Sequence, residues 1–227
     1  MLFANPFGAE LFAFVRDLTE HNDRDWFKRN KSRYELDVKE PAFAFISGFE
    51  PHLREISPHF LAIPKAQGGS LFRIHRDTRF SADKSPYKTH VGIHFRHAAG
   101  AGAHTPGFYL HLQPGQSFVG VGLWRPDPPT LRQIRDAIVA RPDAWTRTRD
   151  AFAARFELAG ESLKKPPRDL APDHPLIEDV KRKDFIGVVM LGDDEVLAAG
   201  FPGRFVAACR DGAPFVQWLC AAVEVPF

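Results

Sequence analysis

The sequence predicts an α+β fold in which an antiparallel, meander-like sheet of about four or five strands carries helices mainly on one face. Apolar residues recur with helical spacing over residues 8–60, with a period of two over residues 70–125, and with mostly helical spacing over residues 128–227. Turn residues divide the period-two region into segments short enough for hairpins. A chain of 227 residues fits one large domain, so we expect residues 1–227 to form a single domain.

Helical stripes and helix breakers alternate in the N-terminal part. Residues 10–20 have the apolar spacing of an amphipathic helix, and Asp23 then has the position of an N-cap. A second stripe over residues 27–49 passes through Pro41, which has no backbone N–H and predicts a kinked helix or two helices. Prolines and glycines in residues 51–69 predict a short helix or turn followed by a loop.

Four strands are expected in the central part: residues 71–77, 89–97, 107–114, and a strand after the hairpin signal Pro114-Gly115-Gln116. Alternation assigns their faces. The side chains expected on the core face are Phe72, Ile74, Val91, Ile93, Phe95, Phe108, Leu110, Leu112, Val119, Val121 and Leu123. The opposite face is expected to carry Arg73, His75, Asp77, His90, Gly92, His94, Arg96, Tyr109, His111, Gln113, Phe118, Gly120, Gly122 and Trp124. The glycines there leave room for a ligand or allow a bend in the strand.

The C-terminal part mixes helices with one more strand. Thr130 is expected to cap a helix, and a second helix is expected around residues 145–156. The basic, proline-rich residues 164–175 form a connection that could supply another wall of a cationic site. Residues 185–191 predict a buried strand, and residues 203–223 predict two short helices.

Composition limits the classes of function. A net charge of +2 lacks the strong field of a general nucleic-acid coat protein, so any basic character acts locally. Cys209 and Cys220 are too few for a disulfide framework and are expected as buried free thiols. The chain shows no signal peptide and no apolar run long enough for a membrane span, which predicts a cytoplasmic protein without a membrane partner. Nothing in the sequence indicates the oligomeric state.

One basic stretch stands out between the strand-like runs. From Arg73 to Lys88, five Lys or Arg side chains and only two carboxylates occupy sixteen residues. Guanidinium forks and ammonium groups can surround a phosphate or carboxylate. The opposite interpretation is that Asp77, Asp83 and other carboxylates pair with these arginines in a structural network.

The same stretch carries a family resemblance. The pattern R-x-x-R-D-x-R-F-x-x-x-K-x-x-Y, from Arg73 to Tyr87, resembles the signature of a functionally uncharacterised bacterial family of proteins of about this length. Further similarities include Trp26-Phe27, residues 107–124 and Asp173-His174-Pro175. The resemblance implies a single intracellular α+β domain and supplies no reaction, cofactor or catalytic residue.

These observations favour an anion-binding pocket, in an enzyme or a binding protein for a phosphorylated or carboxylated small molecule. Hydrogen bonding and proton transfer would come from Tyr87, Tyr109 and His111, the catalytic candidates. The ligand-binding candidates are Arg73, Arg76, Arg79, Lys84 and Lys88, with Trp124 as an apolar or stacking wall.

Two other classes remain open. In a nucleic-acid or phosphoprotein binding module, the basic stretch would follow phosphates while Tyr109 and Trp124 stack on bases. In a protein-interaction domain without a small ligand, the same side chains would form a hot spot. A metal site is disfavoured because His90 and His94 would lie roughly 13 Å apart on a regular strand. No motif for a cofactor is present, since the glycines of residues 115–122 lie in a hairpin strand.

Overall fold

The computed structural model describes residues 2–65, 67–79, 81–100, 105–167 and 173–227. Its five strands form an antiparallel sheet in the order β1-β2-β3-β5-β4. The strands are β1 (Val91–Arg96), β2 (Gly107–Leu112), β3 (Ser117–Leu123), β4 (Glu157–Ala159) and β5 (Phe185–Leu191). β1 pairs with β2 and β2 pairs with β3, so the first three strands form the predicted meander.

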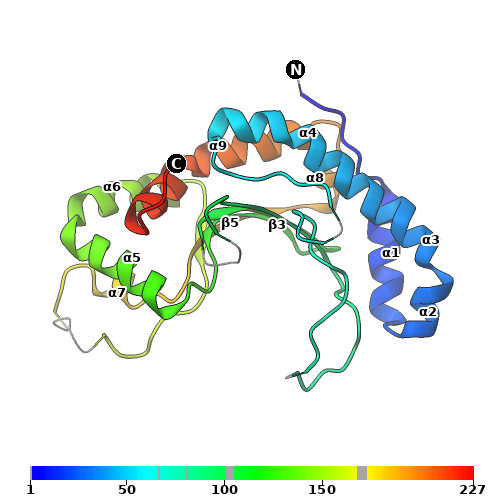
Figure 1. Cartoon of the computed structure of the whole chain (residues 1–227), viewed down its shortest axis with the longest axis horizontal. Coiled ribbons are helices and arrows are strands. Elements are labelled where there is room, and N and C mark those ends of the chain that lie inside the picture. Colours follow the sequence, from blue (N-terminus) through cyan, green and yellow to red (C-terminus); the bar gives the residue numbers. More distant parts are fainter. Residues whose placement is uncertain (1, 66, 80, 101–104, 168–172) are drawn as a thin grey trace.

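Helices cover one face of this sheet. Figure 1 shows α4 and α9 crossing the same face, with α1–α3 beyond one end and α5–α7 beyond the other. The helices are α1 (Ala9–Glu20), α2 (Arg24–Arg29), α3 (Lys31–Arg33), α4 (Glu40–Ile56), α5 (Pro128–Ala140), α6 (Pro142–Ala153), α7 (Ile177–Val180), α8 (Asp193–Leu197) and α9 (Phe201–Ala222), with a π-helical turn at Tyr34–Lys39. The fold is therefore α+β with a helical layer on one side of the sheet.

The core lies between the sheet and this layer. Every core-facing side chain predicted on β1, β2 and β3 is buried. Phenylalanine rings join the layers: Phe49 of α4 lies 4.7 Å from Phe95 of β1 and 4.8 Å from Phe205 of α9, between ring centroids. Alternation therefore assigned the two faces of these strands correctly.

The prolines of the two long helical stripes deform helices without ending them. The chain widens into the π-helical turn before Pro41, which stands in the first turn of α4, where no intrahelical N–H bond is needed. Pro214 lies inside α9, so the prediction of two short helices there was wrong. Burial on both sides of Pro214 outweighs its local cost, and a Cβ on Gly212 would lie only 2.6 Å from Val121 of β3.

Aspartate side chains cap the starts of α2 and α5. Asp23 caps α2, because its carboxylate accepts the Trp26 N–H at 2.8 Å. The cap of α5 is Asp127, which accepts the Thr130 N–H at 3.0 Å, so the assignment to Thr130 was wrong.

Cys209 and Cys220 are buried free thiols, and burial raises the pKa of Cys220 to about 12.

Residues 71–77 do not form the predicted strand. They make only single bridges, Leu71 with Ile93 and His75 with Tyr87. Beyond Phe72 this segment leaves β1 and pairs with its own return: the Arg76 N–H donates to the Pro86 carbonyl and the Lys88 N–H to that of Ile74. We call residues 72–88 the arm. In Figure 1 the arm extends from the sheet on the side away from α4 and α9.

Phe72 also differs from its predicted position on the core face. Its side chain is 40% exposed and lies beside Tyr109 and His94, on the face opposite the helices.

No described helix is both long and apolar enough to cross a membrane.

Candidate functional site

The structure divides the predicted site residues between two surfaces. Arg76, Lys84 and Tyr87 line a hollow of about 890 Å³ between the arm and the start of α2, which we call the arm pocket. The second surface is the sheet face opposite the helices, which we call the open face. Tyr109 and His111 lie there. The sequence had suggested one site for all of them.

The arm pocket exists because the base of the arm is fixed to the α1–α2 region. The Tyr87 ring stacks on Phe27 with centroids 4.2 Å apart. The Asn22 amide accepts the Tyr87 N–H and donates to the Tyr87 carbonyl, both at 3.0 Å. Burial raises the pKa of the Tyr87 hydroxyl, so this group stays protonated and can donate a hydrogen bond.

Carboxylates of the arm pair with two of its arginines. Arg79 forms a fork with Asp77, with Nε–Oδ1 at 2.9 Å and Nη2–Oδ2 at 2.7 Å. Hydrogen bonds from Arg79 lower the pKa of Asp77 to about 2. Arg76 forms an ion pair with Asp83. The structural-network interpretation therefore describes these two arginines well.

The remaining groups of the arm complete this network. The pKa of Asp83 is lowered to about 2, first by the Ser85 N–H and then by Arg76. Arg76 also donates to the Ser85 hydroxyl. The Lys84 ammonium donates to the Thr78 carbonyl at 2.9 Å. One of the three donors of Lys84 is thus used by the arm, and the side chain remains exposed at the pocket.

Arg24 is a pocket residue that sequence reasoning missed. It opens α2, is exposed, and has no ion pair among the described residues. Asp23 and Asp25 stand on either side of it and also line the pocket. Only the packing of the arm against α2 brings Arg24 near Arg76 and Lys84, so no local pattern could have indicated it.

Tyr109, His111 and Gln113 form a chain of hydrogen bonds on the open face. The Nε2–H of His111 donates to Gln113 Oε1 at 3.1 Å, which leaves Nδ1 to accept the Tyr109 hydroxyl at 3.2 Å. Burial lowers the pKa of His111 and raises that of Tyr109. Both groups are therefore neutral near pH 7, and the Gln113 amide ends the chain as a hydrogen-bond acceptor, not as a proton acceptor.

Rings on three neighbouring segments hold this chain in place. The His111 ring lies between His90, at 4.4 Å, and Phe118, at 4.6 Å. Burial, with help from the nearby charges of His111 and Lys88, lowers the pKa of His90 to about 4. Burial also lowers the pKa of His94 to about 4. The imidazoles of this face are thus uncharged at neutral pH.

The glycines beside these rings are explained by their neighbours. A Cβ on Gly92 would lie 2.6 Å from the Tyr109 hydroxyl. A Cβ on Gly120 would lie 3.3 Å from the tip of Ile186 and in ordinary van der Waals contact with Tyr109 and Phe118. Gly122 has φ 124°, and a Cβ there would lie 2.1 Å from the Phe185 carbonyl oxygen. Side-chain packing therefore accounts for Gly92, and backbone conformation accounts for Gly122.

Four ligand-binding candidates do not line the arm pocket: Arg79, which forms its fork with Asp77, and Arg73, Lys88 and Trp124. Lys88 places its ammonium 5.0 Å from the centre of the Phe72 ring, and burial, then the charge of Arg73, lowers its pKa. Arg73 is exposed on the arm. Trp124 follows β3 and is 45% exposed. Phe80 of the arm and residues 168–172 of the basic connection lie outside the described residues.

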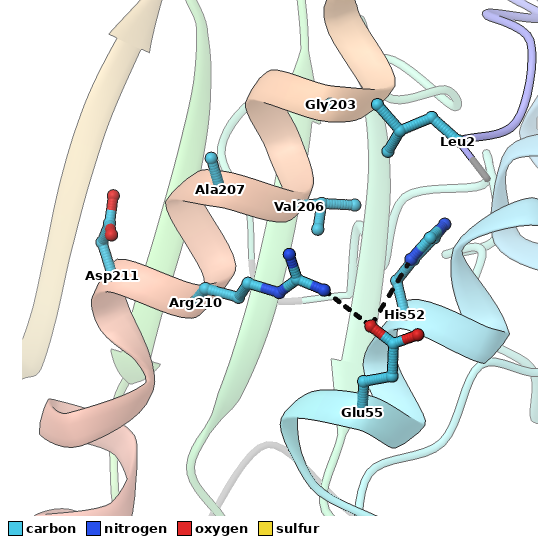
Figure 2. A pocket seen from close by; sticks show the side chains of 8 residues that line it. All are labelled: Leu2, His52, Glu55, Gly203, Val206, Ala207, Arg210 and Asp211. Carbon is cyan, nitrogen blue, oxygen red and sulfur yellow. Dashed lines mark hydrogen bonds and ion pairs between the residues drawn. The ribbon is translucent and has the colours of Figure 1, made fainter.

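A second hollow lies between α4 and α9. Figure 2 shows His52 and Arg210 both directed at Glu55, with distances of 3.9 Å from His52 Nδ1 and 2.6 Å from Arg210 Nη2 to Glu55 Oε2. Asp211 at its edge pairs with Arg155. Its cation is already paired, and none of the predicted site residues lines it, so the arm pocket is the better candidate for an anion.

Comparisons with known proteins find a family match for the chain. Residues 10–218 match the model of a family of conserved hypothetical proteins. No curated protein and no solved structure matches the chain. The match covers most of the chain and includes the arm, α2 and every strand of the sheet.

Proposed function

The chain belongs to this family, DUF2461, whose description names no reaction, and we propose that it binds a small anion in the arm pocket. The main support is that cationic side chains from two distant segments, Arg24 of α2 and Arg76 and Lys84 of the arm, line one hollow. A phosphorylated or carboxylated small molecule is the ligand class that such a set of donors favours.

The lining also suggests how the ligand is oriented. Lys84 and the hydroxyls of Thr78 and Ser85 lie on the arm side, whereas Asp23 and Asp25 lie on the α2 side. The anionic group is therefore expected against the arm, with Arg24 reaching it from α2. Hydroxyl or ammonium groups of the same ligand would face the two carboxylates, because a second anionic group there would be repelled.

Among the catalytic candidates, Tyr87 is the one that lines the arm pocket. Burial raises its pKa, so a reaction in the pocket would use the Tyr87 hydroxyl as a proton donor. Tyr109 and His111 are hydrogen-bonded to each other on the open face. The proposal for the arm pocket is thus one of binding, with Tyr87 as the group to test once a ligand is known.

Thermal unfolding tests this proposal. The wild type is melted with inorganic phosphate, sugar phosphates and small carboxylates, and the Arg24→Ala, Lys84→Ala and Arg29→Ala variants are melted with whichever anion stabilises it. A ligand at about 100 times its dissociation constant adds roughly 2.7 kcal/mol, a shift of a few degrees for a chain of this size. We expect Arg24→Ala and Lys84→Ala to lose most of the shift.

Arg29→Ala is the matched control, because Arg29 is exposed on α2 but does not line the pocket. It should keep the full shift. If no anion stabilises the wild type, or if all three variants respond like the wild type, the arm pocket is not an anion site.

A further inference from the structure

The open face ends in two exposed aromatic rings, each beside a cation. Among the described residues, the exposed large hydrophobic side chains are Leu2, Leu36, Phe72, Trp124 and Met190. Phe72 has the Lys88 ammonium 5.0 Å from its ring centre, and Trp124 has the Arg125 guanidinium carbon at 5.8 Å. From these two ring–cation pairs we propose that the open face binds single-stranded nucleic acid.

The two pairs lie at opposite ends of the strands. Phe72 contacts the position of Gly92, near the start of β1. At the other end, Arg96 pairs with Gly107, which pairs with Gly122, and Trp124 follows two residues later. The step from Gly92 to Arg96 is four residues, and the step from Gly122 to Trp124 is two more. At 3.3 Å per residue, the two ring–cation pairs are therefore about 20 Å apart along the strands. A single small anion cannot reach both cations, whereas an extended polyanion can.

Trp124 lies one residue beyond β3, and because Leu123 is buried in the core, we infer from continued alternation that Trp124 lies on the open-face side. The surface between the two pairs suits a stacked, negatively charged chain. The open-face positions of β1, β2 and β3 hold glycines, rings and Arg96, with no carboxylate among them. Phe118 and the 58% exposed Met190 of β5 form a register pair in the middle of the face.

Single strands are favoured over duplexes because their bases are free to stack. An aromatic side chain on a sheet surface can stack on an unpaired base while neighbouring Lys and Arg contact the phosphates. In a duplex the bases are already stacked, and only the phosphate contacts would remain. The ring–cation pairs Phe72–Lys88 and Trp124–Arg125 each supply both kinds of contact.

Fluorescence anisotropy tests the proposal. The full chain is titrated into a labelled single-stranded 12-nucleotide DNA, and into RNA of the same sequence, at 50 mM salt. Base–aromatic stacking predicts that Phe72→Ala and Trp124→Ala each weaken binding by about 5- to 150-fold. Leu36→Ala is the matched control, because Leu36 is 61% exposed on the π-helical turn. It should bind as the wild type does.

Salt dependence tests the phosphate contacts. Four contacts, from Lys88, Arg73, Arg96 and Arg125, predict binding roughly 50-fold weaker at 200 mM than at 50 mM salt. Lys88→Ala should reduce the slope of log K against log salt by about 0.7. A duplex of the same sequence should compete poorly.

Three outcomes would overturn the proposal: no binding at 50 mM salt, equal binding by Leu36→Ala and by both ring variants, or equal affinity for single strand and duplex. Circular dichroism confirms that each variant is folded. If Arg24→Ala abolishes binding while Phe72→Ala leaves it intact, the strand binds at the arm pocket and the open-face proposal is wrong. The anion-binding proposal can fail separately, because inorganic phosphate contains no base to stack.

Discussion

At the scale of single residues, Gly122 shows how a backbone requirement can resemble an opening for a ligand. Its φ of 124° lies in the region that side chains other than glycine rarely adopt. The Phe185 carbonyl oxygen of the neighbouring strand would also lie 2.1 Å from an added Cβ. The glycines of the open face can be read from the sequence. The reason for Gly122 cannot, because Phe185 of β5, the residue that approaches it, lies 63 residues further along the chain.

We therefore expect Gly122→Ala to lower the free energy of unfolding by about 1–3 kcal/mol, through strain and displacement of β5. Urea denaturation would measure the change. Gly200→Ala is the control, since Gly200 has φ −80° and no atom within 4 Å of an added Cβ. It should change stability by less than about 0.5 kcal/mol. Equal effects of the two substitutions would contradict this explanation.

At the scale of elements, the arm is the segment where alternation misled. Residues 71–77 have a strand-like period because they do pair, but beyond Leu71 and Phe72 their partners are residues 86–88 of the same arm. The period of a sequence does not identify the partner. The strands that have two long neighbours, β2 and β3, were predicted with the correct faces because both of their faces are defined by the sheet.

The ion pair of Arg76 and Asp83 is expected to hold the tip of the arm. Asp83→Asn removes the charge but keeps an oxygen that can accept the Ser85 N–H. We expect trypsin to cleave the arm roughly two- to fivefold faster in this variant, with an unchanged melting temperature, because an exposed ion pair affects local more than global stability.

Asp143→Asn serves as the control for that experiment. Asp143 lies exposed in the first turn of α6, away from the arm. Trypsin should cleave the arm of the Asp143→Asn variant at the same rate as that of the wild type. Unchanged cleavage in Asp83→Asn would mean that the ion pair does not order the arm.

At the scale of the whole molecule, the buried imidazoles of the open face make stability depend on pH. Burial lowers the folded pKa of His90 and of His94 to about 4, below the usual histidine value of 6.5. Below about pH 6.5 the unfolded chain therefore takes up protons that the native protein does not. The free energy of unfolding should fall between pH 6.5 and pH 4, by up to about 1.4 kcal/mol per pH unit for each histidine.

Denaturant unfolding at half-unit steps of pH would measure this loss. His90→Asn should reduce the slope of the free energy of unfolding against pH by up to the contribution of one histidine. His21→Asn, at the exposed end of α1, should leave this slope unchanged. The lowered pKa values of Asp77 and Asp83 make their contribution fall only below about pH 5, where the unfolded carboxylates take up protons, so the slope between pH 6.5 and pH 5 reports the histidines. A slope that is the same in His90→Asn as in the wild type would contradict the assignment.

The candidate sites show the same division between local and long-range information. The sequence indicated the arm's cations and the polar face of the sheet, because both follow from residues close together in the chain. It did not separate Tyr87 from Tyr109 and His111, and it did not include Arg24. Those facts depend on how the arm turns away from β1 and packs against α2.

The connection between β3 and β5 has a consequence for how the family can vary. After β3 the chain makes a long excursion that forms α5, α6, β4 and α7 before β5 pairs beside β3, and β4 joins the sheet at the other edge of β5. Because loop-closure entropy grows only with the logarithm of length, this excursion of roughly 60 residues costs about 2 kcal/mol more to close than the short turn at residues 113–116. Insertions in the exposed connections of this excursion would therefore cost little, whereas its helices, which bury Ile134, Trp145 and Phe152 in the core, would keep their geometry together with the meander and the arm.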